Sequence, residues 1–199
     1  IKNAPHILTP SASTFIYNGA EELKGPGGLH LLVDVAHGID IPRSGDVFFK
    51  RGWLHGFGDI FITKSGVMLP RCKLCDASVW QPERLDFNGP PTCKTPLEQR
   101  RPSPRVFNAD AEPLDTALAF KSLTFAEEAE FVKLKGAAIR EARPEANRIK
   151  DQWIDDQMVA ALAEEKPAEE DVEERTAQLR ETYTMAIKKQ VLMGDFVLI

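Results

Sequence analysis

The glycine-rich turn at residues 25–28, followed at once by the apolar run 29–33, constrains the fold of this chain most. The run LHLLV has the length and composition of a buried β-strand. Glycine lets a backbone approach a ligand closely, and His30 sets an imidazole just beyond that backbone. This combination suits a phosphate group or a metal-bound nucleotide. The structural alternative is a core histidine hydrogen-bonded to a carbonyl group.

Length and composition are those of a chain that can bury a core of its own. Its 199 residues suffice for one large or two small domains, and 43% of them are hydrophobic, as in ordinary globular proteins. No apolar run has the length of a membrane span, and the N-terminal residues lack the pattern of a signal peptide. Three cysteines, an odd number, favour a reducing compartment over a secreted disulfide framework. We therefore expect a cytoplasmic protein without a membrane partner.

The net charge of −5 is unevenly distributed along the chain. Residues 124–199 contain 11 Lys and Arg against 17 Asp and Glu, whereas the first 123 residues contain 14 against 13. The acidity therefore belongs to the C-terminal part, and the front part does not strongly repel polyanions. The first residues, Ile-Lys-Asn, and the apolar run after Gly194 and Asp195 predict a fragment of a longer protein.

The front half alternates short strands with polar turns. We expect strands at residues 6–10 and 15–17, separated by the hydroxyl-rich turn 11–14. The hydroxyl groups of Ser11 and Ser13 either donate hydrogen bonds to phosphate oxygens or cap their own turn.

A helix and a hairpin are expected after the glycine-rich strand. Asp40 can cap a helix whose apolar contact is made by Phe48, Phe49 and Trp53. Residues 59–80 predict a β-hairpin with Lys64 at the tip of its turn.

Asp76 is the most informative acid of the front half. Alternation of side chains along the second strand of that hairpin would put it on one face with Leu74, Ser78 and Trp80. A carboxylate on such a face is costly to bury unless it is paired, hydrogen-bonded or bound to a metal. Asp76 is therefore a candidate metal ligand, and an ion pair with Arg71 or Arg84 is the structural alternative.

The remainder of the chain contains a basic loop and a helical region. In the proline-rich loop 89–104 and at its end, Arg100, Arg101 and Arg105 can reach a nucleic-acid backbone, although a solvated linker is the commoner explanation. A capping box begins at Thr124, and Pro144 and Pro167 divide the region that follows it. We expect three helices there, over residues 124–142, 145–165 and 169–192.

Cys72 and Cys75 have the CxxC spacing of zinc and redox sites, with Cys93 further along the chain. A tetrahedral zinc site needs four ligands, and His37 or His55 would have to complete it. Side-chain alternation along a strand would also turn Cys72 and Cys75 to opposite faces. The pattern therefore predicts no zinc and three unremarkable cysteines.

Taken in order, these features resemble the primase-polymerases of the archaeo-eukaryotic primase superfamily, and most closely the versions carried by bacterial phages and plasmids. The likeness covers roughly residues 6–105, and the helical remainder more weakly resembles the segment that precedes a helicase-like ATPase in such replication proteins. The residues that carry it are Pro10-Ser11-Ala12-Ser13, Gly25 to His30, Asp40-Ile41-Pro42-Arg43, Trp53-Leu54, Lys64-Ser65-Gly66, Leu69, Arg71, Asp76 and Pro82-Glu83-Arg84-Leu85.

The resemblance implies a fold and a reaction. The expected fold is α+β, a small mixed sheet with a crossover helix followed by a C-terminal helical subdomain. The expected domains are a partial primase-polymerase-like domain at 1–105, a linker at 106–123 and a helical subdomain at 124–199. The expected reaction is template-directed transfer of nucleotides from nucleoside triphosphates on single-stranded DNA.

The resemblance also implies roles for individual residues. His30 matches the histidine of the second active-site motif and would contact the incoming triphosphate. Asp76 matches the single acid of the third motif and would share a catalytic Mg²⁺ or Mn²⁺. The remaining nucleotide-binding candidates are Ser11, Ser13, Gly27, Gly28, Lys64, Arg71 and Arg84.

The first motif of the family, an Asp-x-Asp pair, has no match before His30, where the first acids are Glu21 and Glu22 in a polar turn. Paired carboxylates hold the ions that align a 3′-hydroxyl with the α-phosphate. Either that motif precedes Ile1 in a parent protein, or the chain is a remnant without catalysis. Besides a DNA primase/polymerase, the sequence thus leaves open a nucleic-acid- or protein-binding module that has lost its metal site, and a zinc-stabilised interaction domain.

Overall fold

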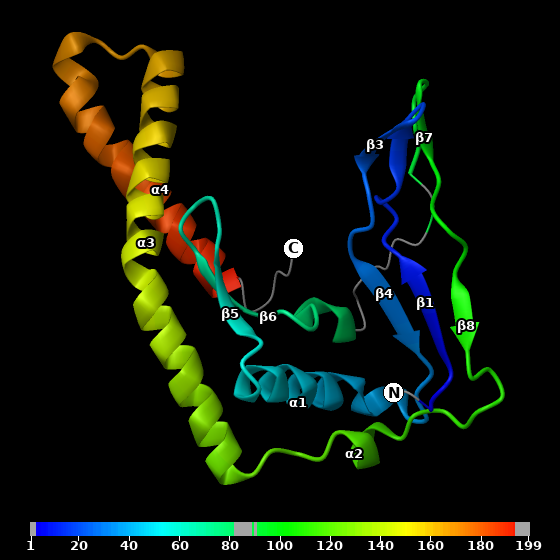
Figure 1. Ribbon diagram of the computed structural model, residues 1–199. Coiled ribbons are helices and arrows are strands. Elements are labelled where there is room, and N and C mark those ends of the chain that lie inside the picture. The colour runs from blue at the N-terminus through cyan, green and yellow to red at the C-terminus, as the bar shows by residue number, and fades with distance from the viewer. Residues whose placement is uncertain (1–2, 82–88, 90, 194–199) are drawn as a thin grey trace. The chain divides into compact units, whose positions relative to one another are not determined.

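The computed structural model describes residues 3–81, 89 and 91–193, which combine short strands with long helices (Figure 1). The chain divides into two compact units. The first unit comprises Ile1–Val47 and Val79–Ser122, and the second comprises Phe48–Ser78 and Leu123–Ile199. The α+β class and the helical C-terminal region expected from the sequence are confirmed.

The first unit contains a three-stranded antiparallel sheet. Its central strand β1 (His6–Pro10) pairs with β4 (Leu29–Val33) on one side and with β8 (Arg105–Phe107) on the other. The strands expected at 6–10 and 29–33 are therefore confirmed. In the register, Thr9 lies opposite His30, and Ile7 lies opposite Leu32.

A second antiparallel sheet of the first unit corrects two expectations. Strand β2 (Ile16–Asn18) lies between β3 (Glu21–Lys24) and β7 (Leu97–Gln99). Glu21 and Glu22 are thus strand residues rather than a polar turn, because Gly19, with φ +58°, reverses the chain directly after β2. The loop expected at 89–104 likewise includes a paired strand.

The expectation that residues 29–33 form a buried strand is wrong. Leu29, Leu31 and Leu32 are 64%, 46% and 42% exposed. The physical reason is that β4 is an edge strand of a sheet only three strands wide. The strand itself forms because its backbone pairs with β1 along its whole length.

Helix α1 (Ile41–Leu54) follows a short 3₁₀ turn, η1 (Gly38–Asp40). Asp40, the expected cap of α1, lies inside η1, and its carboxylate accepts hydrogen bonds from Arg43, at 2.5 and 2.7 Å, and from the Thr116 hydroxyl, at 2.5 Å. Thr116 opens the short helix α2 (Thr116–Ala119). A glycine follows the end of α1: Gly56, with φ +81°, donates its N–H to the Trp53 carbonyl at 3.0 Å.

The second unit contains the predicted hairpin, but the hairpin is shorter than expected. Strands β5 (Gly58–Ile62) and β6 (Met68–Cys72) pair antiparallel around the turn that holds Lys64. The second strand ends at Cys72 instead of continuing to residue 80, because the chain reverses there. Helix α1 leads from β4 to β5, which belong to different sheets, so it is not a crossover within one sheet.

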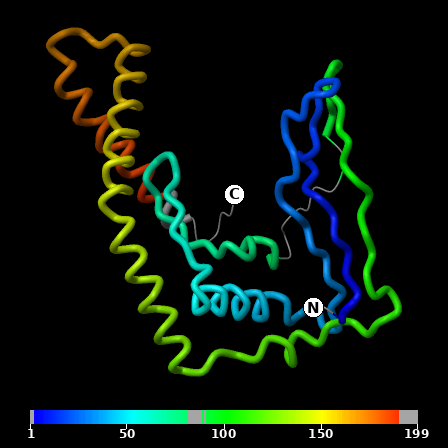
Figure 2. Tube along the Cα trace, viewed as in Figure 1, coloured from blue at the N-terminus to red at the C-terminus, as the bar shows by residue number. Residues whose placement is uncertain are grey.

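The helical region has two long helices instead of the three expected. The capping box at Thr124 is confirmed, and α3 (Phe125–Glu165) continues through Pro144. After η3 (Glu169–Asp171), α4 (Val172–Met193) returns along α3 (Figure 2). A proline in a helix interior removes one hydrogen bond, but packing against the hairpin turn holds the helix on the C-terminal side of Pro144. A Cβ at Gly66 would lie only 2.5 Å from the Ala146 carbonyl oxygen.

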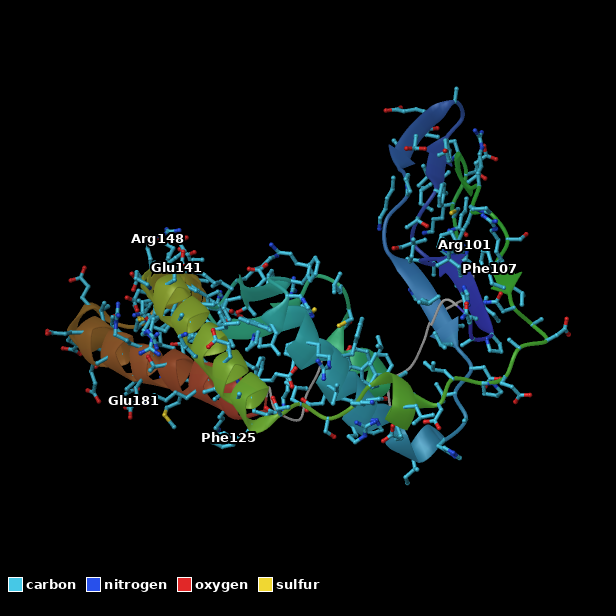
Figure 3. All side chains as sticks on the ribbon, turned by 60° about the horizontal axis from the view of Figure 1, so that its bottom comes forward. Arg101, Phe107, Phe125, Glu141, Arg148 and Glu181 are labelled. Atoms are coloured by element: carbon cyan, nitrogen blue, oxygen red, sulfur yellow. The ribbon has the colours of Figure 1, made fainter. Side chains whose placement is uncertain are left out.

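Apolar side chains hold the second unit together. Val67, next to β6, packs with α3 and α4 through a buried cluster. Phe49 and Trp53 of α1 meet Phe131 of α3, with ring centroids 6.4 and 6.1 Å apart. Charged side chains such as Glu141, Arg148 and Glu181 extend outward from the two long helices (Figure 3). The members of the buried cluster are Val67, Ile154, Met158, Leu179 and Ile187.

None of the helices in the described part of the chain is long and apolar enough to cross a membrane.

Candidate functional site

The hydroxyl-rich turn and the glycine-rich turn lie side by side in the first unit. Strand β1 ends at Pro10 opposite Leu29, where β4 begins. One residue beyond this pair, the backbone N–H of Ser11 donates to the Gly28 carbonyl at 2.8 Å. His30 follows on β4, half-buried and opposite Thr9, which is 3% exposed. The structure thus brings together the nucleotide-binding candidates Ser11, Ser13, Gly27, Gly28 and His30.

Thr14 anchors the hydroxyl-rich turn from inside. Its side chain is 1% exposed, and its hydroxyl donates to the Ser11 carbonyl at 2.7 Å. A hydroxyl of the turn itself therefore caps the turn, which is one of the two alternatives expected for it. That hydroxyl belongs to Thr14. Ser13 remains exposed, and its hydroxyl accepts a hydrogen bond from the Lys24 ammonium group at 2.9 Å. Lys24 places a positive charge at the turn.

The glycine-rich turn is packed closely against that anchor. A Cβ at Gly27 would lie 2.8 Å from Cγ2 of Thr14, closer than real Cβ contacts come, so a larger residue would push the two turns apart. A Cβ at Gly28 would lie 3.9 Å from the Ser11 Cβ, which is an ordinary contact. Packing thus accounts for glycine at position 27, while Gly28 is exposed and accepts the bond from Ser11.

Strand β7 and the residues after it support the same turn. The Gln99 amide donates to the carbonyls of Ala12 and Thr14 at 2.7 and 2.8 Å. Arg101, labelled in Figure 3, donates to the Pro10 carbonyl at 3.3 Å. Arg100 and Arg105 lie over the rings of Tyr17 and Phe107. This basic segment is therefore built into the first unit, and contact of these arginines with nucleic acid stays a prediction.

Asp76 is not on a strand, which corrects the face assignment made from side-chain alternation. It lies between Cys75 and a 3₁₀ turn, η2 (Ala77–Trp80), because the chain reverses at residues 73 and 74. Its Oδ1 accepts hydrogen bonds from the N–H of Ser78, at 2.9 Å, and from its hydroxyl, at 2.8 Å. Ser78 is 2% exposed, so a buried partner holds the exposed Asp76 carboxylate in place.

The other candidates belong to the second unit or lie outside the described residues. Lys64 is exposed in the hairpin turn, and the Arg71 guanidinium lies 3.5 Å from the ring centroid of Phe61. Arg84 falls within residues 82–88, outside the described part. His30 and Asp76 belong to different units. The resemblance implies that both belong to one active site. Asp76 is not on a strand, and the joint role of the two residues stays a prediction.

The expected separation of Cys72 and Cys75 on opposite faces is also wrong. The two residues are paired across the reversal, so their side chains lie on the same face. Burial and the neighbouring Cys72 raise the pKa of the Cys75 thiol to about 12. The expectation that the protein holds no zinc therefore rests only on the missing further ligands.

Within residues 3–81, 89 and 91–193, no three His, Cys, Asp or Glu side chains are grouped so that they could share a metal ion. Comparisons with protein-family models, with curated proteins and with solved structures give no match for this chain.

Sequence reasoning missed three residues that shape the candidate site: Thr9, Lys24 and Gln99. Thr9 acts through strand pairing, and Gln99 acts through hydrogen bonds to backbone carbonyls. No local sequence pattern indicates either of these contacts. Lys24 is eleven residues from Ser13 and meets it only because β2 and β3 form a hairpin. Asn18-Gly19 is typical of a hairpin turn, and pairing of the residues on both sides of it would have signalled Lys24.

Proposed function

We propose that this chain is part of a DNA primase/polymerase of the phage or plasmid type, which transfers nucleotides from nucleoside triphosphates to a strand growing on a single-stranded template. The observation that carries the proposal is the junction of the two turns in the first unit. There the Ser11 N–H joins the Gly28 carbonyl at 2.8 Å, beside His30 on a paired strand. The reaction named in this proposal is the one implied by the resemblance to the primase superfamily.

The chemistry of this junction suits a triphosphate. An imidazole N–H, serine hydroxyls and a lysine ammonium group are all hydrogen-bond donors to phosphate oxygens. His30, Ser13 and Lys24 supply these groups, and the exposed Gly28 lets a ligand approach the backbone. In the proposal His30 holds the phosphates of the incoming nucleotide, and the two turns position them.

Three residues of the second unit complete the proposal. Lys64 and Arg71 offer exposed positive charge for phosphate or template, and stacking on Phe61 limits the orientations of the Arg71 guanidinium. Asp76 is the candidate acid, and Ser78 fixes the carboxylate. Arg84 remains a candidate from the resemblance alone.

The described residues do not by themselves fit the Mg²⁺ or Mn²⁺ that such an enzyme needs. Asp76 is a single carboxylate, one of its oxygens already accepts two hydrogen bonds, and no cluster of three ligands is found in the described part. Two-metal sites need several carboxylates. The proposal therefore assigns the remaining metal ligands to carboxylates outside this sequence.

Triphosphate binding by the 199-residue chain tests the proposed binding role. We expect weak binding of a nucleoside triphosphate, measured by calorimetry, and no nucleotide incorporation. The His30→Ala variant should weaken binding by roughly tenfold to a hundredfold, since a hydrogen bond to a charged group contributes about 1.5–3 kcal/mol. The matched control is His55→Ala, at an exposed histidine of the second unit. Equal affinities of all three proteins would remove His30 from the proposed site.

Primer extension by a longer protein that contains this chain tests the catalytic role. The Asp76→Asn variant keeps an oxygen that accepts from Ser78 but loses the negative charge, so we expect extension to be abolished. The Ser78→Ala variant removes only the supporting hydroxyl and should retain part of the activity. Normal extension by Asp76→Asn, or no extension by the unchanged protein with either metal ion, would overturn the enzymatic proposal.

A non-catalytic module that binds nucleic acid or protein is the second candidate. One observation favours it: the first acids of the chain, Glu21 and Glu22, lie on the exposed strand β3, and Glu22 accepts a hydrogen bond from Tyr17 at 2.5 Å. They do not form the paired aspartate site of the family. Binding of single-stranded DNA without any triphosphate dependence would support this candidate over the enzyme.

A further inference from the structure

We propose that Cys72 and Cys75 form a reversible intramolecular disulfide, so that the turn between β6 and Asp76 is a thiol–disulfide modification site. This inference concerns residues that the primase resemblance leaves without a role. It rests on the geometry of the reversal after β6 and does not depend on the proposed function.

The backbone already holds the two cysteines at the spacing that a disulfide requires. Cys72 and Cys75 form an antiparallel bridge, and the Cys75 N–H donates to the Cys72 carbonyl at 3.2 Å. Directly opposed residues in antiparallel pairs have Cα atoms roughly 4.5–5.5 Å apart, within the roughly 4.4–6.8 Å that disulfides span. The bond therefore needs rotation of side chains and no movement of an element.

The side chains face each other as well. Directly opposed residues of an antiparallel pair carry their side chains on the same face, so both thiols lie on one side of the turn. The Cys72 sulfur packs against α1, because a Cβ at Gly52 would lie 2.4 Å from it. The base of the turn is anchored where the Lys73 N–H donates to the Phe57 carbonyl at 2.8 Å. Helix and hairpin thus hold Cys72 in place and leave Cys75 beside it.

The different exposure of the two cysteines determines which of them reacts first. Cys72 is 6% exposed, whereas Cys75 is half-buried and open to a small molecule. The oxidant is a low-molecular-weight disulfide. The sulfur of Cys75 loses its proton to hydroxide and attacks one sulfur of that disulfide, whose S–S bond breaks and releases one thiol. The raised pKa of the Cys75 thiol makes this first step slow near neutral pH.

The sulfur of Cys72 then attacks the mixed disulfide, loses its proton and releases the second thiol. The two cysteines together lose two electrons and two protons, and the small disulfide gains them. Reduction by a dithiol reverses both steps. Because Asp76 follows Cys75 directly, the closed ring ties the backbone of Asp76 to the end of β6.

The test uses the full chain at equilibrium in buffers of reduced and oxidised glutathione of graded ratio, followed by alkylation and tryptic mapping. Trypsin cleaves after Arg71, Lys73 and Arg84. The proposed bond therefore joins the dipeptide Cys72-Lys73 to the peptide 74–84, a product that no other pairing gives. Titratable thiols should fall from three to one.

Variants at each cysteine make the outcome decisive. Cys93→Ser should retain the linked peptide, and Cys75→Ser, at the half-buried position, should lose it while the far-UV circular dichroism stays unchanged. Amide hydrogen exchange at residues 76–78 should slow by several-fold on oxidation of the unchanged chain. The proposal is overturned if Cys93 provides the main linkage, if no linked peptide forms at any ratio, or if the reduced chain carries one zinc ion per molecule.

Discussion

The two units of this protein bury different kinds of side chain. Among the described residues, the second unit buries large apolar side chains such as Trp53, Phe131, Ile154 and Met158, besides Ser65 and Ser78. The buried side chains of the first unit are small or carry hydroxyls, and its largest aliphatic side chains are at least partly exposed. These buried residues of the first unit are Ala4, Thr9, Thr14, Ser44, Val47 and Thr116.

This difference separates two ways of stabilising a fold. Burial of apolar area contributes about 25 cal/mol per Å² and is not directional, so the second unit tolerates polar changes on its surface. Hydrogen bonds contribute only about 1 kcal/mol each but fix geometry. The first unit, with its strand ladders and with Thr14 and Gln99 bonded to carbonyls, is built the second way. The candidate phosphate-binding turns lie in the unit held by directional bonds.

Truncation of Ile154 should give the largest effect. Ile154 is 2% exposed in the core cluster of the second unit, and we expect Ile154→Ala to lower the free energy of unfolding by about 2–5 kcal/mol. Urea denaturation followed by far-UV circular dichroism measures it. Val159→Ala, 68% exposed on the same helix, is the matched control and should change stability by less than about 0.5 kcal/mol.

The same measurement on the first unit can contradict the difference between the two units. Leu31→Ala truncates a side chain that is 46% exposed on β4, so it should cost less than about 1.5 kcal/mol, well below the value for a buried leucine. A loss equal to that of Ile154→Ala would mean that Leu31 is covered in solution, and that the two units do not differ in the way described.

Two glycines with positive φ sharpen the comparison further. Gly66 (φ +78°) lies in the turn between β5 and β6, and Gly19 (φ +58°) follows β2 directly. A Cβ at Gly66 would lie 2.5 Å from the Ala146 carbonyl oxygen, whereas a Cβ at Gly19 has nothing within 4 Å. Gly19→Ala should cost only the left-handed conformation, about 1–2 kcal/mol. Gly66→Ala should cost more, by about a further 1–3 kcal/mol, since α3 must move. Equal losses would mean that the hairpin turn does not rest on α3.

Local sequence patterns predicted the elements well where one residue type settles the local conformation. The capping box at Thr124 and the strand at 6–10 are both determined by neighbouring residues. The helix end predicted at Pro144 is wrong, because one missing hydrogen bond does not end a helix whose flanks are packed. That packing joins Gly66 and Ala146, which are far apart in the sequence.

The candidate site was predictable in part for the same reason. Ser11, the glycines and His30 were found together because they flank two strands that pair directly. The face assignments of Asp76 and of the two cysteines failed together, because alternation assumes a continuous strand and the chain reverses after Cys72. Gln99 was missed because β7 exists only through its pairing with β2.

The smallest expected effect is a pH dependence in the first unit. Hydrogen bonds from Arg43 and from the Thr116 hydroxyl lower the pKa of Asp40 from its ordinary 3.8 to about 2. A carboxyl whose pKa is lower in the folded state contributes stability above its unfolded value and loses it as the pH falls through the folded value. The contribution of Asp40 should therefore be complete above about pH 4 and fade towards pH 2.

The variant Asp40→Asn tests this window through the urea midpoint as a function of pH. It should be less stable than the unchanged chain at pH values above the ordinary 3.8, and the difference should shrink towards about pH 2. Arg43 and Asp40 are partly exposed, so added salt should reduce the effect. Thr116→Val removes one donor at similar volume and should move the window upward, towards 3.8. Parallel curves for Asp40→Asn and the unchanged chain would show that the Asp40–Arg43–Thr116 bonds are absent in solution. These bonds could then no longer be counted among the directional bonds that stabilise the first unit.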